Sequence, residues 1–196
     1  AKRKTEELNI KKIEYMQADI LQLKKLNKQF DIIESGGTLH HMKDPVKGLK
    51  VLLDILVPRG ILKLGLYSET ARKHIVEARE FIKRKNYKNI SKDIKICRQD
   101  IINEKENPIN QKIILHNDFY STSSVRDLLF HVQEHRFTIP QISKILKDLN
   151  LEFLGFFFLN PPIKKKFSKL FPEDKNNISL DNWHQFEINN PNIFAG

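Results

Sequence analysis

The apolar positions of the chain form short continuous runs separated by longer stretches with helical spacing. FDIIES at residues 30–35 and ILKLGLY at 61–67 are apolar enough for strands that are buried on both faces. IEYMQ at 13–17 and LEFLGFFFL at 151–159 are rich in β-branched or aromatic residues and predict two further strands. Because helical segments alternate with these runs, the pattern predicts an α/β fold with a mainly parallel sheet.

Cap residues and prolines mark the predicted helices. Pro45 fits the first turn of a helix over 45–57, which Pro58-Arg59-Gly60 would end. We expect the strands on either side of this helix to be parallel neighbours joined by a right-handed crossover. Other helices are predicted over 1–8, over 68–85 with Ser68 as N-cap, in parts of 86–117, over 121–134, over 138–150 with Thr138 as N-cap, in a short basic stretch after Pro161-Pro162, and after the cap Ser179.

The composition of the 196 residues fits one domain with a real core and 40% hydrophobic residues. A single cysteine, Cys97, and a basic, polar start predict a reduced, cytoplasmic protein, and no apolar run reaches the ~20 residues that span a bilayer. The formal charge of +10 permits nucleic-acid binding. The charge is lysine-rich and spread along the chain, however, and its tightest cluster, Lys164 to Lys166, reads as a solvated surface.

Polar and small residues follow three of the predicted strands, where ligands bind in open parallel sheets. Asp19 ends the first strand and is either an acceptor for an amino group or a turn former. Gly36 and Gly37 follow Ser35, and they either let a ligand approach the backbone or simply make a turn. Tyr67 and Ser68 follow the third strand.

The string FDIIESGGTLHHMKDP, followed by a helix and LVPRGILKLGLYS, resembles the motif IV and motif V region of class I S-adenosylmethionine-dependent methyltransferases. QADI before it is similar to the position where the family has an acidic residue facing the adenine. Order and spacing agree over residues 13–68. The region 116–196 looks similar to a narrower bacterial group that is often fused to tetratricopeptide repeats, which implies such repeats in the full-length protein.

This resemblance implies S-adenosylmethionine as cofactor and methyl transfer to an unidentified acceptor, with no metal and with no catalytic residue identified. By resemblance, Asp19 would bind the adenine and Ile20 would cover its ring. Ser35, Gly36 and Gly37 would face the methionine part, and His40 would lie in the loop beside the cofactor. Contacts to the acceptor are assigned to Tyr67, Arg72, Tyr120 and Arg126.

The sequence also departs from the family. The Gly-x-Gly cofactor loop is not found in the 196 residues. The predicted strands match family strands 3, 4, 5 and 6, whereas strands 1, 2 and 7 have no counterpart. We therefore expect a partial Rossmann-like sheet, cut at both ends, with weak cofactor binding and exposed sheet edges. Within a single partial domain, we assign 1–85 to the cofactor side, 86–137 to a helical insertion, and 138–196 to a helix, strand and tail.

The histidines and the basic charge leave other interpretations open. His40 and His41 could act as a general base or a metal site, although the resemblance favours a lining role. His131 and His135, in the string His131-x-x-Glu134-His135, resemble an inverted zinc motif but lack an evident third ligand. Arg126 and Asp127 face a substrate or cap a helix. Two rival functions are a non-catalytic methyltransferase-like scaffold, and an RNA-binding protein or RNA methyltransferase.

Overall fold

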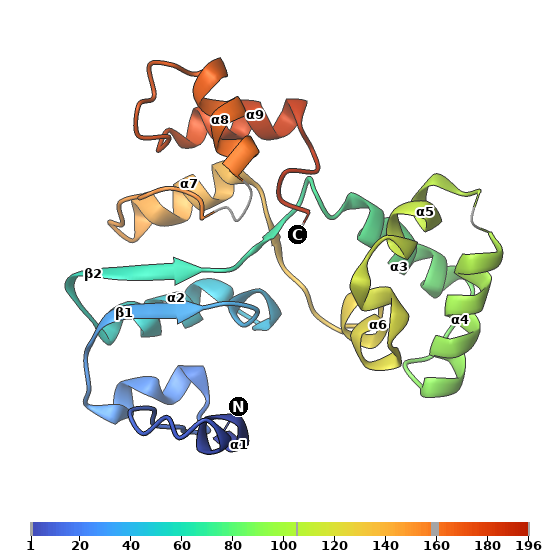
Figure 1. Ribbon diagram of the computed structural model, residues 1–196, viewed down its shortest axis with the longest axis horizontal. Helices are drawn as coiled ribbons and strands as arrows, with labels where there is room; N and C mark the ends of the chain where they lie inside the picture. Colours follow the sequence, from blue (N-terminus) through green and yellow to red (C-terminus); the bar gives the residue numbers. More distant parts are fainter. Residues whose placement is uncertain (1, 105, 158–160, 196) are drawn as a thin grey trace.

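The computed structural model describes residues 2–104, 106–157 and 161–195. Figure 1 shows a small parallel sheet with helices against it. A separate group of helices, α3 to α6, lies to one side and is joined to the sheet region by extended segments of the chain. The elements, in chain order, are α1 (Lys2–Glu7), η1 (Ile20–Leu26), β1 (Phe30–Ser35), η2 (Leu39–His41), α2 (Pro45–Asp54), β2 (Leu56–Leu64), β3 (Tyr67–Ser68), α3 (Lys73–Arg84), α4 (Ser91–Asn103), α5 (Pro108–Ile114), η3 (Asn117–Tyr120), α6 (Thr122–Leu129), β4 (Arg136–Phe137), α7 (Ile139–Asp148), α8 (Pro161–Leu170) and α9 (Leu180–Asn189).

The β1–α2–β2 unit confirms the central prediction, because β1 and β2 are parallel neighbours joined by a helix that begins at Pro45. Asp44 caps this helix by accepting a hydrogen bond from the backbone N–H of Lys47 at 2.9 Å. Ile32 pairs with Ile61 in the parallel register. The handedness of the crossover stays a prediction.

The segment Pro58-Arg59-Gly60 lies inside β2 and does not end the helix, which already stops at Asp54. Arg59 has a φ of +65°, and the register of β1 against β2 shifts between Phe30 and Ile32. Proline has no N–H to donate to the ladder, and a left-handed residue breaks the pleat. The segment therefore forms an irregularity between two paired stretches of one strand.

Two predicted strands are wrong in the described part of the chain. Residues 13–17 run without a strand partner, and so do residues 151–157, while 158 and 159 lie outside the described residues. Both segments have strand-type composition, but a strand also needs a neighbour to accept its hydrogen bonds. The small parallel sheet therefore holds fewer strands than the family pattern implies.

Two boundaries also differ from the prediction. The helix expected over 68–85 begins at Lys73, because Tyr67 and Ser68 form β3 and pair in parallel with β4. The helix expected over 121–134 ends at Leu129, and the residues after it cross the molecule toward β4. Ser121, Thr138 and Ser179 cap α6, α7 and α9 as the sequence predicts.

Three apolar cores lie within the part of the chain that the structure describes. The first lies among α3 to α6, and the second surrounds the Phe167 and Trp183 rings, which stack with centroids 3.7 Å apart. The third packs Leu49 and Leu52 of α2 against Ile33 and Leu62 on one face of the sheet. Since α3 contributes to the first core, the helical group begins within the segment that we assigned to the cofactor side.

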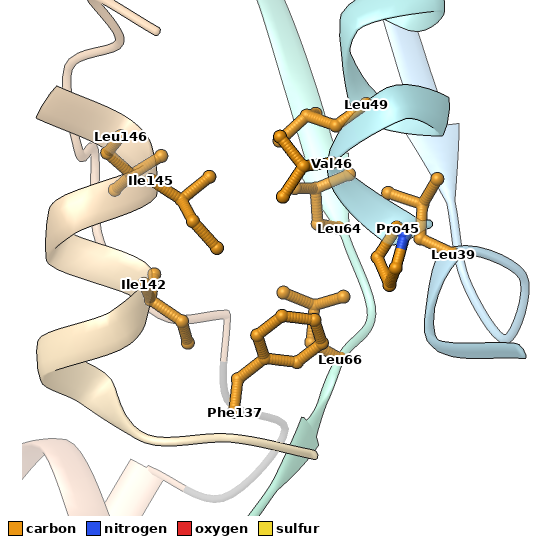
Figure 2. A pocket seen from close by; sticks show the side chains of 10 residues that line it. All are labelled: Leu39, Pro45, Val46, Leu49, Leu64, Leu66, Phe137, Ile142, Ile145 and Leu146. Carbon is orange, nitrogen blue, oxygen red and sulfur yellow. The ribbon is translucent and has the colours of Figure 1, made fainter. Parts of the chain in front are cut away.

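A small apolar cavity lies between α2 and α7, next to the end of β2 (Figure 2). Its volume is about 30 Å³, and its lining is entirely apolar: Leu39, Pro45, Val46, Leu49, Leu64, Leu66, Phe137, Ile142, Ile145 and Leu146. This space is the size of one water molecule and offers it no hydrogen-bond partner. The cavity is therefore a packing gap and not a candidate site.

Candidate functional site

The turn Ser35-Gly36-Gly37 follows β1 at the carboxyl edge of the sheet. The carbonyl of Ser35 accepts a hydrogen bond from the N–H of Gly65 at 2.9 Å, so the ends of β1 and β2 stay paired there. A Cβ on Gly65 would lie 3.2 Å from Cα of Gly36. The two backbones therefore pass so closely that a side chain at position 65 would fit only if the Gly36 backbone shifted by a few tenths of an ångström.

Open space lies over this turn. A Cβ built on Gly36 or on Gly37 would meet no atom within 4 Å, and Gly37 has a φ of +68°, which favours glycine. The turn thus exposes backbone to a region that a ligand can enter. This geometry fits the expectation that Ser35, Gly36 and Gly37 face a cofactor, although the assignment itself stays a prediction.

His40 lies beside the turn, with 1% of its surface exposed. Its Nδ1 is 3.3 Å from the carbonyl oxygen of Gly65, which can only accept, so Nδ1 carries the proton in this contact. The Nε2 atom is buried and has no partner among the described residues. Burial and the neighbouring His41 lower the pKa of His40 to about 4. His40 therefore presents a neutral ring with an unused lone pair.

Residues 131–135, which precede β4, contact the η2 turn through ring stacking and hydrogen bonds. The ring of His41 stacks on that of His131 at 3.9 Å, and its Nδ1 lies 2.9 Å from the carbonyl oxygen of Gln133. The N–H of His135 donates to the carbonyl of His40 at 2.7 Å. Within the described residues, no three His, Cys, Asp or Glu side chains are grouped to hold a metal ion. His131 and His135 thus contribute to packing between two loops.

Tyr67 and Arg72 lie in contact with each other, and their assignment to the acceptor stays a prediction. The guanidinium carbon of Arg72 lies 3.7 Å from the centre of the Tyr67 ring, and the His40 ring lies 3.9 Å from it. Arg72 is itself buried, however, with 8% of its surface exposed. The Arg72 side chain therefore packs against the Tyr67 ring and has little surface left to contact a methyl acceptor from solvent.

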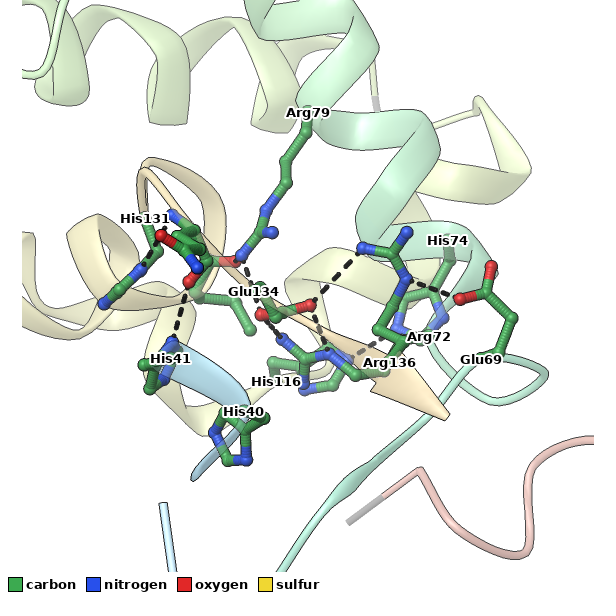
Figure 3. A network of polar contacts seen from close by, with 12 residues as sticks. His40, His41, Glu69, Arg72, His74, Arg79, His116, His131, Glu134 and Arg136 are labelled. Carbon is green, nitrogen blue, oxygen red and sulfur yellow. Dashed lines mark hydrogen bonds and ion pairs between the residues drawn. The ribbon is translucent and has the colours of Figure 1, made fainter. Parts of the chain in front are cut away.

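Glu134 is the centre of a buried ionic network (Figure 3). Arg72 donates to both of its carboxylate oxygens, at 3.1 and 3.0 Å, and Arg79 donates to one of them at 2.8 Å. Burial alone would raise the pKa of Glu134, but Arg72 and Arg79 outweigh it and the net shift is downward. Arg136 lies 3.8 Å away and also pairs with Glu69 at 3.0 Å.

The sequence analysis missed this network. Glu134 was noted only as the middle of a histidine string, and Arg79 and Arg136 were not singled out. Their contacts join α3 to the connection before β4, across 55 and 62 residues of chain. The only available signal was a single acidic residue, Glu134, between His131 and His135.

Asp19 and Ile20 lie at the start of η1. One carboxylate oxygen of Asp19 accepts the N–H of Leu21 at 2.9 Å, so the residue acts as a helix cap. Ile20 is half-buried against the core beneath α2. Whether they also meet an adenine stays a prediction.

Tyr120 and Arg126 make their contacts inside the helical group. The hydroxyl of Tyr120 donates to the carbonyl of Ile114 at 2.9 Å, and Arg126 donates to Asn89 at 2.9 Å. Neither makes a contact with Tyr67 or Arg72 in the described residues. Their assignment to the acceptor is untested, and these contacts give both side chains a role in packing.

Comparison with known proteins finds a family match for the N-terminal part of the chain. Residues 1–64 match the family model described as the methyltransferase domain. An uncharacterized protein from Synechococcus sp. is 27% identical over 154 residues, which cover 74% of this chain and 36% of the relative. The chain thus spans about a third of the length of that curated relative. No described helix is both long and apolar enough for a membrane span. Residues 1–64 are therefore similar to a methyltransferase domain, in agreement with the resemblance of the motifs to class I S-adenosylmethionine-dependent methyltransferases.

Proposed function

We propose that this chain forms part of an enzyme that transfers a methyl group from S-adenosylmethionine to an acceptor not yet identified. The observation that carries the proposal is the Ser35-Gly36-Gly37 turn. It lies at the carboxyl end of two parallel strands, with backbone exposed to open space. In open parallel sheets this is the edge where ligands bind. Methyl transfer in general is what the family match supports.

The residues around the turn fit the cofactor by their chemistry. The glycines leave room for it beside the strand ends, and Asp19 keeps its second carboxylate oxygen without a partner among the described residues. That oxygen could accept a hydrogen bond from an adenine amino group. The buried lone pair on Nε2 of His40 could accept from an N–H or O–H donor of a ligand. When bound, the cofactor supplies an electrophilic methyl group.

The acceptor side centres on Tyr67. Its ring is held by His40 and by Arg72, and Arg72 is in turn held by Glu134. Such a supported ring can position an acceptor, and positioning supplies most of the rate in a displacement of this kind. A base is needed only where the acceptor must first lose a proton.

Calorimetry with S-adenosylmethionine tests the proposal. We expect weak or absent binding by residues 1–196, because these contain no Gly-x-Gly loop, and tight binding by a chain extended before residue 1. In the extended chain, Gly36→Leu would place its Cβ where no atom lies within 4 Å and would extend the side chain into the region proposed for the cofactor. It should abolish binding and leave the melting temperature unchanged, whereas Gly36→Ala should weaken binding less. Unchanged binding by Gly36→Leu would refute the proposed site.

A binding or scaffold module without catalysis is the second candidate. The burial of Arg72 in an ionic network favours it. If the extended chain binds no cofactor and Gly36→Leu changes nothing, this candidate replaces the first. The cytoplasmic location and the tetratricopeptide repeats implied by the resemblance stay predictions.

A further inference from the structure

Positive charge gathers at the corner between α3 and α4, which corrects the expectation that it is spread along the chain. Residues 83–98 contain seven lysines and arginines and a single acidic residue, Asp93. This stretch of sixteen residues therefore carries +6 of the formal +10 of the whole chain. Six of the cations are exposed and are called the basic corner below: Lys83, Arg84, Lys85, Lys88, Lys92 and Lys95.

The basic corner has no acidic partner. Among the described residues, none of its six side chains forms an ion pair, whereas Lys24, Lys63 and Lys144 each pair with a carboxylate. Two carboxylates of α4 make other contacts. Asp93 accepts the backbone N–H of Lys88 at 2.8 Å, and Asp100 accepts the hydroxyl of Tyr87. Six unpaired like charges repel one another, and a polyanion would relieve that repulsion.

The structure separates the basic corner from the candidate methyl-transfer site. Figure 1 shows α3 and α4 in the helical group, away from the β1–β2 sheet. On α4, Lys92 and Lys95 are one turn apart on the exposed side. The opposite side buries Ile94, Cys97 and Ile101, which are each 0% exposed. Because the core occupies this apolar side, α4 cannot insert it into a lipid surface.

We propose that the basic corner binds the phosphate backbone of RNA. Lysines are point charges that suit contacts to phosphate without reading sequence. Two exposed amides lie near them in the sequence: Asn86, whose oxygen accepts from Lys88, can still donate, and Gln99, whose nitrogen donates to Asn103, can still accept. A ribose 2′-hydroxyl, which DNA lacks, can both accept and donate. The partner is thus a nucleic acid held through backbone and sugar. This inference does not depend on the proposed methyl transfer.

Fluorescence polarization with the 196-residue chain tests it, using a labelled single-stranded RNA of about 20 nucleotides and mixed sequence. Titrations at about 50 mM to about 200 mM salt give the dependence of affinity on salt. The variant is K88A/K92A/K95A. The matched control is K164A/K165A/K169A, which removes the same charge from exposed positions of α8. DNA of the same sequence and vesicles containing phosphatidylserine are the competing ligands.

We expect the corner variant to bind RNA about tenfold more weakly and to lower the salt slope by about 2, since each lost phosphate contact removes about 0.7. The α8 control should stay within about twofold of the unaltered chain, and RNA should bind about threefold more tightly than DNA. Equal losses in both variants, no RNA binding, or equal binding of DNA would overturn the proposal. Vesicle binding without RNA binding would replace it with a membrane surface. Circular dichroism confirms that each variant is folded.

Discussion

His74 and His116 face each other through their Nε2 atoms, which lie 2.8 Å apart. A hydrogen bond between these atoms needs one protonated nitrogen and one lone pair, so two charged rings would break it. Burial and the nearby His116 lower the pKa of His74 to about 4, and burial and Arg72 lower that of His116. The hydrogen bond between the two neutral rings therefore links α3 to the segment that follows α5.

This contact predicts a loss of stability as the pH falls. Between pH 6.5 and about 4 the unfolded state binds a proton that folded His74 does not, so stability rises with pH in that window. Lowering the pH from about 7 to about 5 should cost about 2 kcal/mol through His74 alone. His74→Gln should flatten this dependence in urea unfolding. His40, whose pKa is also lowered to about 4, should leave a residual slope in that variant. An equally steep dependence in His74→Gln would contradict the prediction.

At the scale of elements, the sequence predicts those segments whose pattern is local. β1, α2 and α7 follow from apolar runs, caps and prolines within a few residues of each other. The strands predicted at 13–17 and, in its described part, at 151–157 are wrong because pairing depends on a neighbour far away in the chain, which composition does not report. The glycine turn of the candidate site was predictable from its neighbouring strands. The Glu134 network was not, because it joins segments 55 and 62 residues apart.

Glu134 lies in the segment before β4, and its ion pairs with Arg72 and Arg79 hold that segment against α3. Replacing Glu134 tests how much these ion pairs stabilise the fold. Glu134→Gln would leave Arg72 and Arg79 buried without their carboxylate, at a cost of about 3–5 kcal/mol in the free energy of unfolding. Glu69→Gln removes a partner of Arg136 that is 43% exposed, so it should cost less than about 1 kcal/mol. Chemical denaturation of both variants measures the difference. Equal losses would show that the buried network does not hold these elements together.

At the scale of the whole molecule, the β1–β2 sheet is covered on one face only. Ile33 and Leu62 pack against the core under α2, whereas the cross-strand pair Ile32 and Ile61 is 66% and 48% exposed on the other face. The sequence predicts exposed sheet edges, and the described residues 13–17 form no strand that pairs with β1.

An uncovered apolar strand face with an unpaired edge is a template for association with a second copy. We therefore expect the 196-residue chain to form dimers or larger assemblies in sedimentation velocity experiments, increasingly so at higher concentration. Ile32→Thr with Ile61→Thr should shift the chain toward monomer, because threonine keeps strand propensity and removes apolar surface. Leu115→Thr with Val132→Thr is the matched control, since these side chains are 82% and 95% exposed outside the sheet. A monomer with a sharp cooperative melt in the unaltered chain, or equal relief by both double variants, would show that the sheet face does not drive association.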